Sequence, residues 1–156
     1  MCQVNYKKEI EELIIKASKI AGKKLTNKVF FIKYQIKGHT PEKLPKNKMA
    51  VYTFVYNGTF LKIGKANVRS NARYQSQHYY LKGNTSTLAN SLLKDENMSN
   101  FITEQNVTQW IKDNCERYDV IINHECGEEA LNFVESLLHY KYTPKYEFKK
   151  SYRGTN

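Results

Sequence analysis

The sequence predicts an α+β fold, in which a small antiparallel sheet of about three central strands is flanked by helices. Three observations carry this prediction. Two β-rich runs meet at Asn57-Gly58, and residues 117–123 form another such run. Residues 6–22 and 128–142 instead carry apolar side chains at helical spacing. The length of 156 residues suits a single domain, 1–156, that buries a core of its own.

The composition excludes disordered and membrane-spanning classes. Hydrophobic residues make up 40% and aromatic residues 13% of the chain, which argues against disorder. The mean hydropathy of −0.68 and the lack of an apolar run near 18 residues argue against a membrane span. No apolar signal segment opens the chain, and three widely spaced cysteines, Cys2, Cys115 and Cys126, suit reduced thiols. We therefore expect a cytoplasmic protein with no membrane partner.

The positive charge is concentrated in one region. The net charge is +10, and the 52 residues between Glu42 and Asp95 contain nine Lys or Arg and no carboxylate. Such a stretch suits a nucleic acid, because each cation placed on a phosphate releases condensed counterions. A solvated basic surface is the alternative. Binding to a membrane surface is disfavoured, because the cations alternate with strand-like and turn-like sequence and do not lie on an amphipathic helix.

Residues 1–48 are predicted to form a helix-and-strand extension at the N-terminus. Apolar side chains recur at helical spacing over 6–22. Residues 30–36, FFIKYQI, favour an extended strand. Residues 39–48 contain two prolines and predict a surface connection to the core, which we assign to 49–148.

Residues 49–64, MAVYTFVYNGTFLKIG, predict a β-hairpin around Asn57-Gly58. A two-residue loop would mix apolar and polar side chains on both faces. A three-residue loop, with Gly58 at positive φ in a bulge, separates the faces and is the register that we predict. In this register Tyr52 lies directly opposite Lys62. The core face would collect Val51, Thr53, Val55, Thr59, Leu61 and Ile63, and Phe60 would lie opposite Phe54 on the other face, with Tyr52.

The elements after the hairpin follow from capping and spacing signals. Asn67 is a candidate N-cap for a helix on which Arg69, Arg73 and Gln77 are spaced four residues apart. Periodicity then predicts short helices over 86–95 and 106–114, a strand over 117–123, and a last helix over 128–142 that ends before Pro144.

Glu135 lies on the edge of the apolar stripe of the last helix, which is formed by Leu131, Val134 and Leu138. Carboxylates avoid apolar surface unless they are paired or reach solvent. Two interpretations stay open from these residues. Glu135 is either a rim glutamate with an ion-pair partner, or a carboxylate placed there for chemistry.

Five elements, in this order, resemble the motifs of the GIY-YIG nuclease family. They are VYT at 51–53, KIG at 62–64, Arg73, Glu135 and TPKYE at 143–147. The resemblance covers about residues 50–147. In it, Tyr52 takes the place of the first-motif tyrosine, and Lys62, ten residues later, opens the second motif in place of the usual tyrosine. Glu147 stands where the family usually has asparagine.

The resemblance implies a divalent-metal-dependent DNA endonuclease, active in restriction, repair or mobile-element biology. Hydrolysis of a phosphodiester needs an activated water, a Lewis acid, and cations for the charge of the transition state. Glu135 would hold one Mg²⁺ or Mn²⁺ ion, and Tyr52 would contact the attacking water as its general base or orienter. Lys62 would stabilise the Tyr52 phenolate, and Arg73 would clamp phosphate oxygens. Further DNA contacts are expected from Lys65, Arg69, His78 and Tyr79.

Two other functions agree with the same residues. One is a nucleic-acid-binding protein that keeps the scaffold but has lost turnover. The other is a basic module for an acidic protein partner, whose affinity would lack the steep salt dependence of binding to a phosphate backbone.

For a nuclease, one catalytic centre cuts one strand, so cleavage of both DNA strands would require a homodimer or two sequential events.

Overall fold

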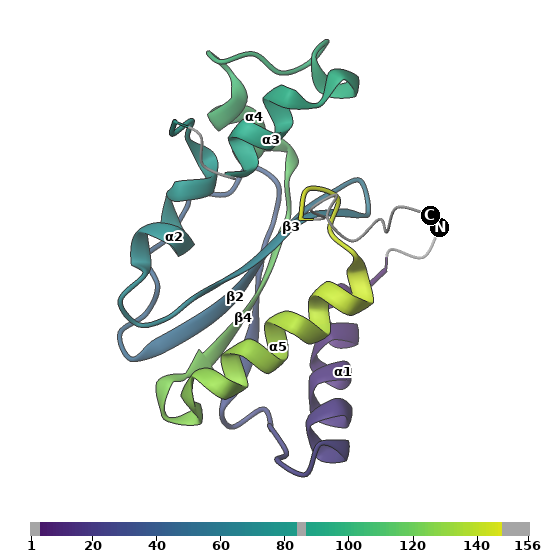
Figure 1. The fold of residues 1–156 in the computed structure, drawn as a ribbon, viewed down its shortest axis with the longest axis vertical. Coiled ribbons are helices and arrows are strands. Elements are labelled where there is room, and N and C mark those ends of the chain that lie inside the picture. Colours follow the sequence, from purple (N-terminus) through teal and green to yellow (C-terminus); the bar gives the residue numbers. More distant parts are fainter. Residues whose placement is uncertain (1–3, 84–86, 148–156) are drawn as a thin grey trace, which may run out of the picture.

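The structure, a computed structural model, describes residues 4–83 and 87–147 (Figure 1). Its helices are α1 (Tyr6–Ile20), α2 (Asn71–Gln75), α3 (Leu88–Lys94), α4 (Val107–Asn114) and α5 (Gly127–Tyr142). Short 3₁₀ turns are η1 (Gln77–Tyr79), η2 (Glu96–Met98) and η3 (His124–Cys126). The strands are β1 (Phe30–Gln35), β2 (Lys48–Tyr56), β3 (Thr59–Ala66) and β4 (Arg117–Asn123). The predicted α+β class is confirmed.

The four strands form one antiparallel sheet in the order β1-β4-β2-β3. The sequence predicts about three central strands, and the additional one is the edge strand β1, which pairs with β4 along its whole length. The predicted N-terminal extension therefore contributes a strand to the same sheet as the hairpin. β3 forms the opposite edge, next to β2.

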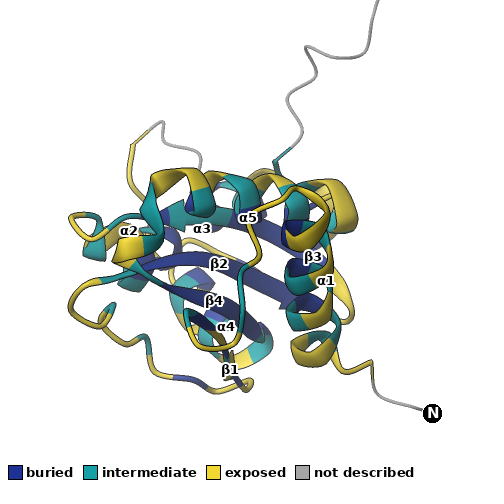
Figure 2. Ribbon diagram, turned by 90° about the horizontal axis from the view of Figure 1, so that it is seen from below, coloured by how far each residue is buried: buried dark blue, intermediate teal, exposed yellow. Residues whose placement is uncertain are grey.

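Helices cover both faces of the sheet, and β2 and β4 lie buried between them (Figure 2). On one face, Ile14 of α1 and Leu138 of α5 belong to one buried cluster. On the other face, Leu92 of α3 and Ile111 of α4 belong to a second cluster, to which α2 and η1 contribute Tyr74 and Tyr79. Because both faces are covered, most residues of the two hairpin strands are buried.

Cys115 and Cys126 are free thiols, as expected, whereas Cys2 lies outside the described residues. The helix predicted over 86–95 is present as α3, although Ser86 also lies outside the described residues. No helix within 4–83 or 87–147 is long and apolar enough to cross a membrane.

The turn of the hairpin is tighter than predicted. Asn57 and Gly58 form it alone, with φ of 46° and 76°, and Tyr56 pairs with Thr59 across it. The positive φ predicted for Gly58 is confirmed, but the predicted three-residue loop is wrong. Two-residue turns with positive φ at both positions match the twist of antiparallel strands, and Asn-Gly strongly favours them.

A β-bulge then shifts the register within β3. Leu61 is an extra residue that has no pairing partner in β2. Beyond it, Tyr52 pairs with Gly64, so the predicted pairing with Lys62 is wrong by two residues. Tyr52 and Lys62 still lie on one face, as predicted, because a shift of two keeps the face. Leu61 itself joins the core on that face, whereas Phe60 joins the opposite core, which reverses the prediction for both.

The helix after the hairpin starts later than predicted. Ser70, not Asn67, is the N-cap of α2. The side-chain oxygen of Asn67 instead accepts hydrogen bonds from the N–H of Arg69 and the hydroxyl of Ser70, which is a turn typical of asparagine. Arg69 therefore precedes the helix and does not share the predicted helical stripe with Arg73.

Candidate active site

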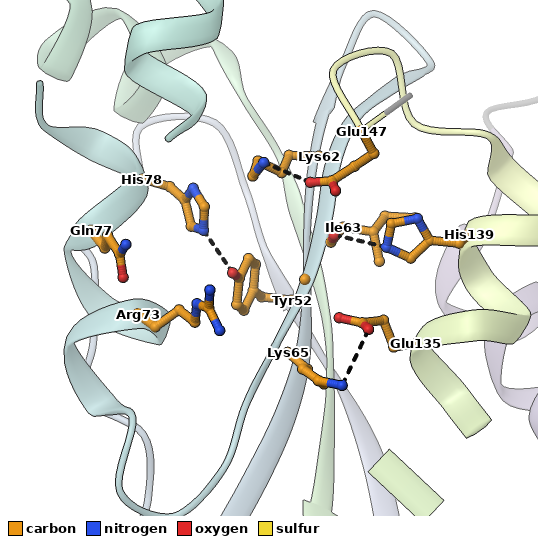
Figure 3. A pocket seen from close by; sticks show the side chains of 11 residues that line it. Tyr52, Lys62, Ile63, Lys65, Arg73, Gln77, His78, Glu135, His139 and Glu147 are labelled. Atoms are coloured by element: carbon orange, nitrogen blue, oxygen red, sulfur yellow. Dashed lines mark hydrogen bonds and ion pairs between the residues drawn. The ribbon is translucent and has the colours of Figure 1, made fainter. Parts of the chain in front are cut away.

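A pocket of about 600 Å³ lies along the edge strand β3, where the two helix layers meet (Figure 3). The α2–η1 segment borders it on one side, and α5 with the chain that follows borders it on the other. Strands β2 and β3 form the floor between them. The lining residues are Tyr52, Lys62, Ile63, Gly64, Lys65, Arg73, Gln77, His78, Glu135, His139 and Glu147.

The pocket brings together most of the predicted site residues. Those that line it are Tyr52, Lys62, Arg73 and Glu135, predicted as catalytic, and Lys65 and His78, predicted as DNA contacts. Two other predicted contacts lie elsewhere. Arg69 borders a neighbouring hollow of about 350 Å³ near the start of α5. Tyr79 is 1% exposed and lies beneath the site, so it is not placed for the predicted contact with DNA.

Gln77 and His139 also line the pocket, although their chemistry has no place in the sequence prediction. The Nε2 of His139 lies 3.0 Å from the backbone oxygen of Ile63 and ties α5 to β3. His139 follows Glu135 by four residues on the same helix, so the two share one face. That spacing is the signal that could have identified it.

Tyr52 reaches the pocket by crossing a glycine. A Cβ on Gly64 would lie 2.3 Å from the Oη of Tyr52 and 2.5 Å from its Cζ, so the ring lies directly over this glycine. Any side chain at position 64 would displace the ring. Gly64 is needed because Tyr52 belongs to an interior strand, is 2% exposed, and has to pass over the edge strand to reach the pocket.

A buried histidine orients the hydroxyl of Tyr52. The Oη of Tyr52 lies 2.6 Å from the Nε2 of His78, and the backbone N–H of Leu88 donates to the Nδ1 of His78 at 3.2 Å. Because Nδ1 accepts, the neutral imidazole carries its proton on Nε2 and donates it to the Tyr52 oxygen. Burial, followed by neighbouring positive charges, lowers the pKa of His78 to about 3, so the ring is neutral at physiological pH.

Tyr52 is a neutral phenol in the free protein. Burial raises the pKa of Tyr52 above its ordinary value of 10, and the positive charge of Arg73 opposes this rise. Since the oxygen accepts from His78, the phenol proton is available to a group in the pocket. Lys62, predicted to stabilise the phenolate from the position directly opposite Tyr52, does not lie there, because Gly64 occupies that position.

Gly64→Ala should push the Tyr52 ring out of the pocket. We expect the free energy of unfolding to fall by about 1–3 kcal/mol, because the new methyl group overpacks a buried contact. The hydrogen bond between Tyr52 and His78 should be lost, which the ring ¹⁵N NMR shifts of His78 would report.

The control for this variant is Gly22→Ala. Gly22 has a φ of 86° and no atom within 4 Å of an added Cβ, so its replacement adds backbone strain without a clash. The His78 shifts should stay unchanged in this control. Unchanged His78 shifts in a folded Gly64→Ala protein would contradict the placement of Tyr52.

Lys62 and Glu147 form a largely buried ion pair. The Nζ of Lys62 lies 2.6 Å from the Oε1 of Glu147, and the two side chains are 6% and 23% exposed. The chain after α5 returns to the bulged end of β3, where two of its backbone N–H groups donate to the carbonyls of Phe60 and Leu61 at 2.9 and 3.1 Å. The bulge therefore provides the place at which this segment docks and sets Glu147 over the Lys62 ammonium.

Glu135 projects from α5 into the pocket, near Lys65. Its Oε1 lies 3.6 Å from the Nζ of Lys65, which also donates to the side-chain oxygen of Asn132. Both ion-pair partners are partly exposed, so solvent screens the pair and its contribution to stability is about 1 kcal/mol or less. Glu135 is thus an ion-paired rim residue that also faces the pocket, and both interpretations from the sequence agree with this position.

The pocket suits a hard cation that keeps most of its water. Within residues 4–83 and 87–147, no group of three or more His, Cys, Asp or Glu is arranged to hold a metal ion. Glu135 and Glu147 nevertheless line the same pocket. Mg²⁺ commonly binds through one or two carboxylates and several waters, whereas structural zinc requires four protein ligands. The donor set fits Mg²⁺, with Glu135 the less tightly paired carboxylate.

Comparison of the chain with protein-family models, with curated proteins and with solved structures yields no match. The function therefore has to be inferred from the chemistry of the pocket. Two carboxylates and three cations, Lys62, Lys65 and Arg73, surround a tyrosine whose oxygen is held by a neutral histidine. Cations that bind phosphate oxygens, beside a carboxylate that can hold a metal ion, suit a phosphate ester.

Proposed function

We propose that the chain is a divalent-metal-dependent DNA endonuclease of the GIY-YIG type, which hydrolyses phosphodiester bonds. The observation that carries the proposal is the convergence of Tyr52, Arg73 and Glu135 in one pocket from three separate elements, β2, α2 and α5. The resemblance assigns these residues to the attacking water, the phosphate and the metal ion. They are far apart in the sequence, so their convergence is a property of the fold.

Each of these residues has a task in the proposed hydrolysis. Glu135 would hold the metal ion, which acts as a Lewis acid on the scissile phosphate when it is bound. Arg73 binds phosphate oxygens through its planar guanidinium and neutralises the charge that develops on them. Tyr52 orients the attacking water and takes its proton. His78 donates to the Tyr52 oxygen and stabilises the phenolate form that accepts this proton.

The rate of cleavage should rise with pH if Tyr52 is the general base. Burial raises the pKa of Tyr52 above 10, so the phenolate is a minor species at neutral pH. Its fraction grows about tenfold with each pH unit, and log rate should rise with a slope near one between about pH 7 and 9. Initial rates of plasmid nicking measure this slope. A flat pH profile would mean that Tyr52 orients the attacking water but does not take its proton.

Supercoiled plasmid DNA tests the proposed activity. The protein should convert it to nicked circles with Mg²⁺ or Mn²⁺, and EDTA should prevent this conversion. Arg73→Lys, purified in the same way, keeps the charge but loses the planar guanidinium, so its nicking should be much slower. That difference would exclude a contaminating nuclease. Intact supercoiled, linear and branched DNA after incubation with either metal ion would contradict the proposal.

A nucleic-acid-binding protein without turnover is the second candidate function. The observation that favours it is that both pocket carboxylates are paired with lysines, Glu147 with Lys62 and Glu135 with Lys65. A metal ion at Glu135 would have to compete with the Lys65 ammonium for this carboxylate. If the protein binds DNA but nicks none at every Mg²⁺ and Mn²⁺ concentration tested, this second candidate function would be favoured.

DNA affinity should fall steeply as salt is raised. The carboxylate-free stretch between Glu42 and Asp95 includes exposed cations such as Lys43, Lys46 and Arg69. Log affinity should fall with log salt at a slope of about −0.9 per neutralised phosphate, with several phosphates involved. Fluorescence anisotropy in EDTA measures this slope. Salt-insensitive binding to duplex, single-stranded and branched DNA would contradict a nucleic-acid partner and favour an acidic protein.

A further inference from the structure

A fully buried ion pair lies beneath the pocket. Arg117 and Asp119 of β4 are both 0% exposed. Their side chains meet through Nε and Oδ1 at 3.3 Å and through Nη2 and Oδ2 at 3.1 Å. Removal of two charges from water costs several kcal/mol per ion, and apolar residues of similar volume often give equal or greater stability. Stability alone is therefore a weak explanation for this pair.

Arg117 contacts both the strand and the segment that carry the site residues. Its Nη1 donates to the backbone oxygen of Tyr74 at 3.2 Å and to the hydroxyl of Tyr79 at 3.0 Å. Its guanidinium also lies 4.7 Å from the ring centroid of Phe54 and 5.9 Å from that of Tyr52. The first two partners belong to the α2–η1 segment and the last two to β2. One side chain thus bridges the two parts of the site.

Asp119 completes this bridge. Its Oδ1 accepts the backbone N–H of Thr53 at 3.1 Å, and its Oδ2 accepts the hydroxyl of Tyr74 at 3.1 Å. Thr53 directly follows Tyr52 in β2. Asp119 therefore fixes the backbone beside Tyr52 and at the same time holds the guanidinium of Arg117 in one orientation.

The α2–η1 segment has little structure of its own to hold it. α2 spans only five residues, and its N-cap Ser70 makes no side-chain hydrogen bond to the helix. A helix this short is unstable without tertiary contacts. The segment nevertheless presents Arg73 and His78 to the pocket. Its position depends on tertiary contacts, among which those with Arg117 are charged and fully buried.

We propose that Arg117 is a positioning residue of the site, which ties the α2–η1 segment to β2 and so places His78 against Tyr52. Arg73, on the same segment, is placed by the same contacts. The effect on catalysis rests on the proposed function, whereas the placement of His78 does not. Arginine is required because its planar guanidinium meets Asp119 through Nε and Nη2 while Nη1 donates to the segment, whereas lysine has a single nitrogen for all of these partners.

Arg117→Lys separates positioning from charge. The readout is the ring ¹⁵N NMR spectrum of His78, which in the wild type should show a neutral ring protonated on Nε2. In the variant we expect both tautomers and a pKa of His78 closer to its ordinary value of 6.5. The kcat for plasmid nicking should fall by about tenfold or more, with KM changed by less than about threefold. A folded variant with the wild-type His78 spectrum and kcat would overturn the proposal.

Tyr79→Phe decides the question if Arg117→Lys does not fold. It keeps the ring and removes the hydroxyl, which lies 3.0 Å from Nη1 of Arg117 and 2.6 Å from Nε2 of His39, so the same changes are expected in smaller degree. His39→Gln removes only the second of these contacts and should leave the His78 spectrum unchanged. Tyr142→Phe is the matched control, because it removes a phenol hydrogen bond to Glu9 in the opposite core. An unchanged His78 spectrum in Tyr79→Phe would overturn the proposal.

The spectra also separate this inference from the proposed function. If the wild type cleaves no DNA, the proposed function fails, and the His78 spectra alone then decide the inference. A changed spectrum in Arg117→Lys or Tyr79→Phe, with none in Tyr142→Phe, supports positioning by Arg117 in the absence of any activity.

Discussion

Glu135→Gln should lower DNA cleavage by about a hundredfold or more and leave DNA binding intact. Glutamine keeps the size of the side chain and its place on α5, but it removes the charge that would hold the metal ion. DNA affinity should stay equal or rise, because Lys65, 3.6 Å away, loses its counter-charge and becomes available to a phosphate. Plasmid nicking and fluorescence anisotropy measure the two effects separately.

The matched controls for Glu135 lie on the same helix. Glu128→Gln and Glu129→Gln alter the first turn of α5, where carboxylates favour the helix dipole, and both should cleave like the wild type. Because its ion pair is partly exposed, Glu135→Gln should change the free energy of unfolding by less than about 1 kcal/mol. A Mn²⁺ titration of the folded proteins reports ion binding directly. If Glu135→Gln cleaved DNA as fast as the wild type, Glu135 would have no part in the reaction.

Tyr52→Phe should lower cleavage by about a thousandfold, since a general base commonly contributes two to four orders of magnitude. The ring and its packing over Gly64 are kept, and only the oxygen that would take the proton is lost. The Nε2–H of His78 then has no acceptor in a buried position, so the free energy of unfolding should fall by about 1–3 kcal/mol. Plasmid nicking and urea unfolding measure these changes.

Tyr56→Phe is the control for the loss of a phenol oxygen. Tyr56 ends the same strand, but its ring packs against that of Trp110 at 4.9 Å, and it does not line the pocket. This variant should cleave like the wild type. Equal cleavage by Tyr52→Phe and Tyr56→Phe would exclude the Tyr52 oxygen from the reaction.

Long regular elements were predictable from local patterns. α1, β4 and α5 begin and end within two residues of the predicted bounds, because each repeats its apolar side chains often enough to define a period. α2 was misplaced, since a helix of five residues shows too little of a period, and Asn67, the predicted cap, lies three residues before Ser70, the observed N-cap.

The hairpin shows why the strand register was predictable only in part: the face shared by Tyr52 and Lys62 was predicted, but their pairing partners were not. The Asn57-Gly58 turn favours a two-residue loop, while separation of the faces favours another register, and a uniform ladder cannot satisfy both. The bulge at Leu61 satisfies both. Its carbonyl accepts an N–H from the segment after α5, which is a contact between distant parts of the chain that no local pattern reports.

The sequence by itself determined the residue types of the candidate site and the region of positive charge, because these are local properties. Only the tertiary structure decided their partners: His78 for Tyr52, Glu147 for Lys62, and Arg117 beneath them. Partners and burial set the pKa of a group, and both depend on segments that folding brings together. For this reason the pKa of Tyr52, expected from the sequence to be lowered by Lys62, is raised in the folded protein, where burial outweighs the neighbouring positive charges.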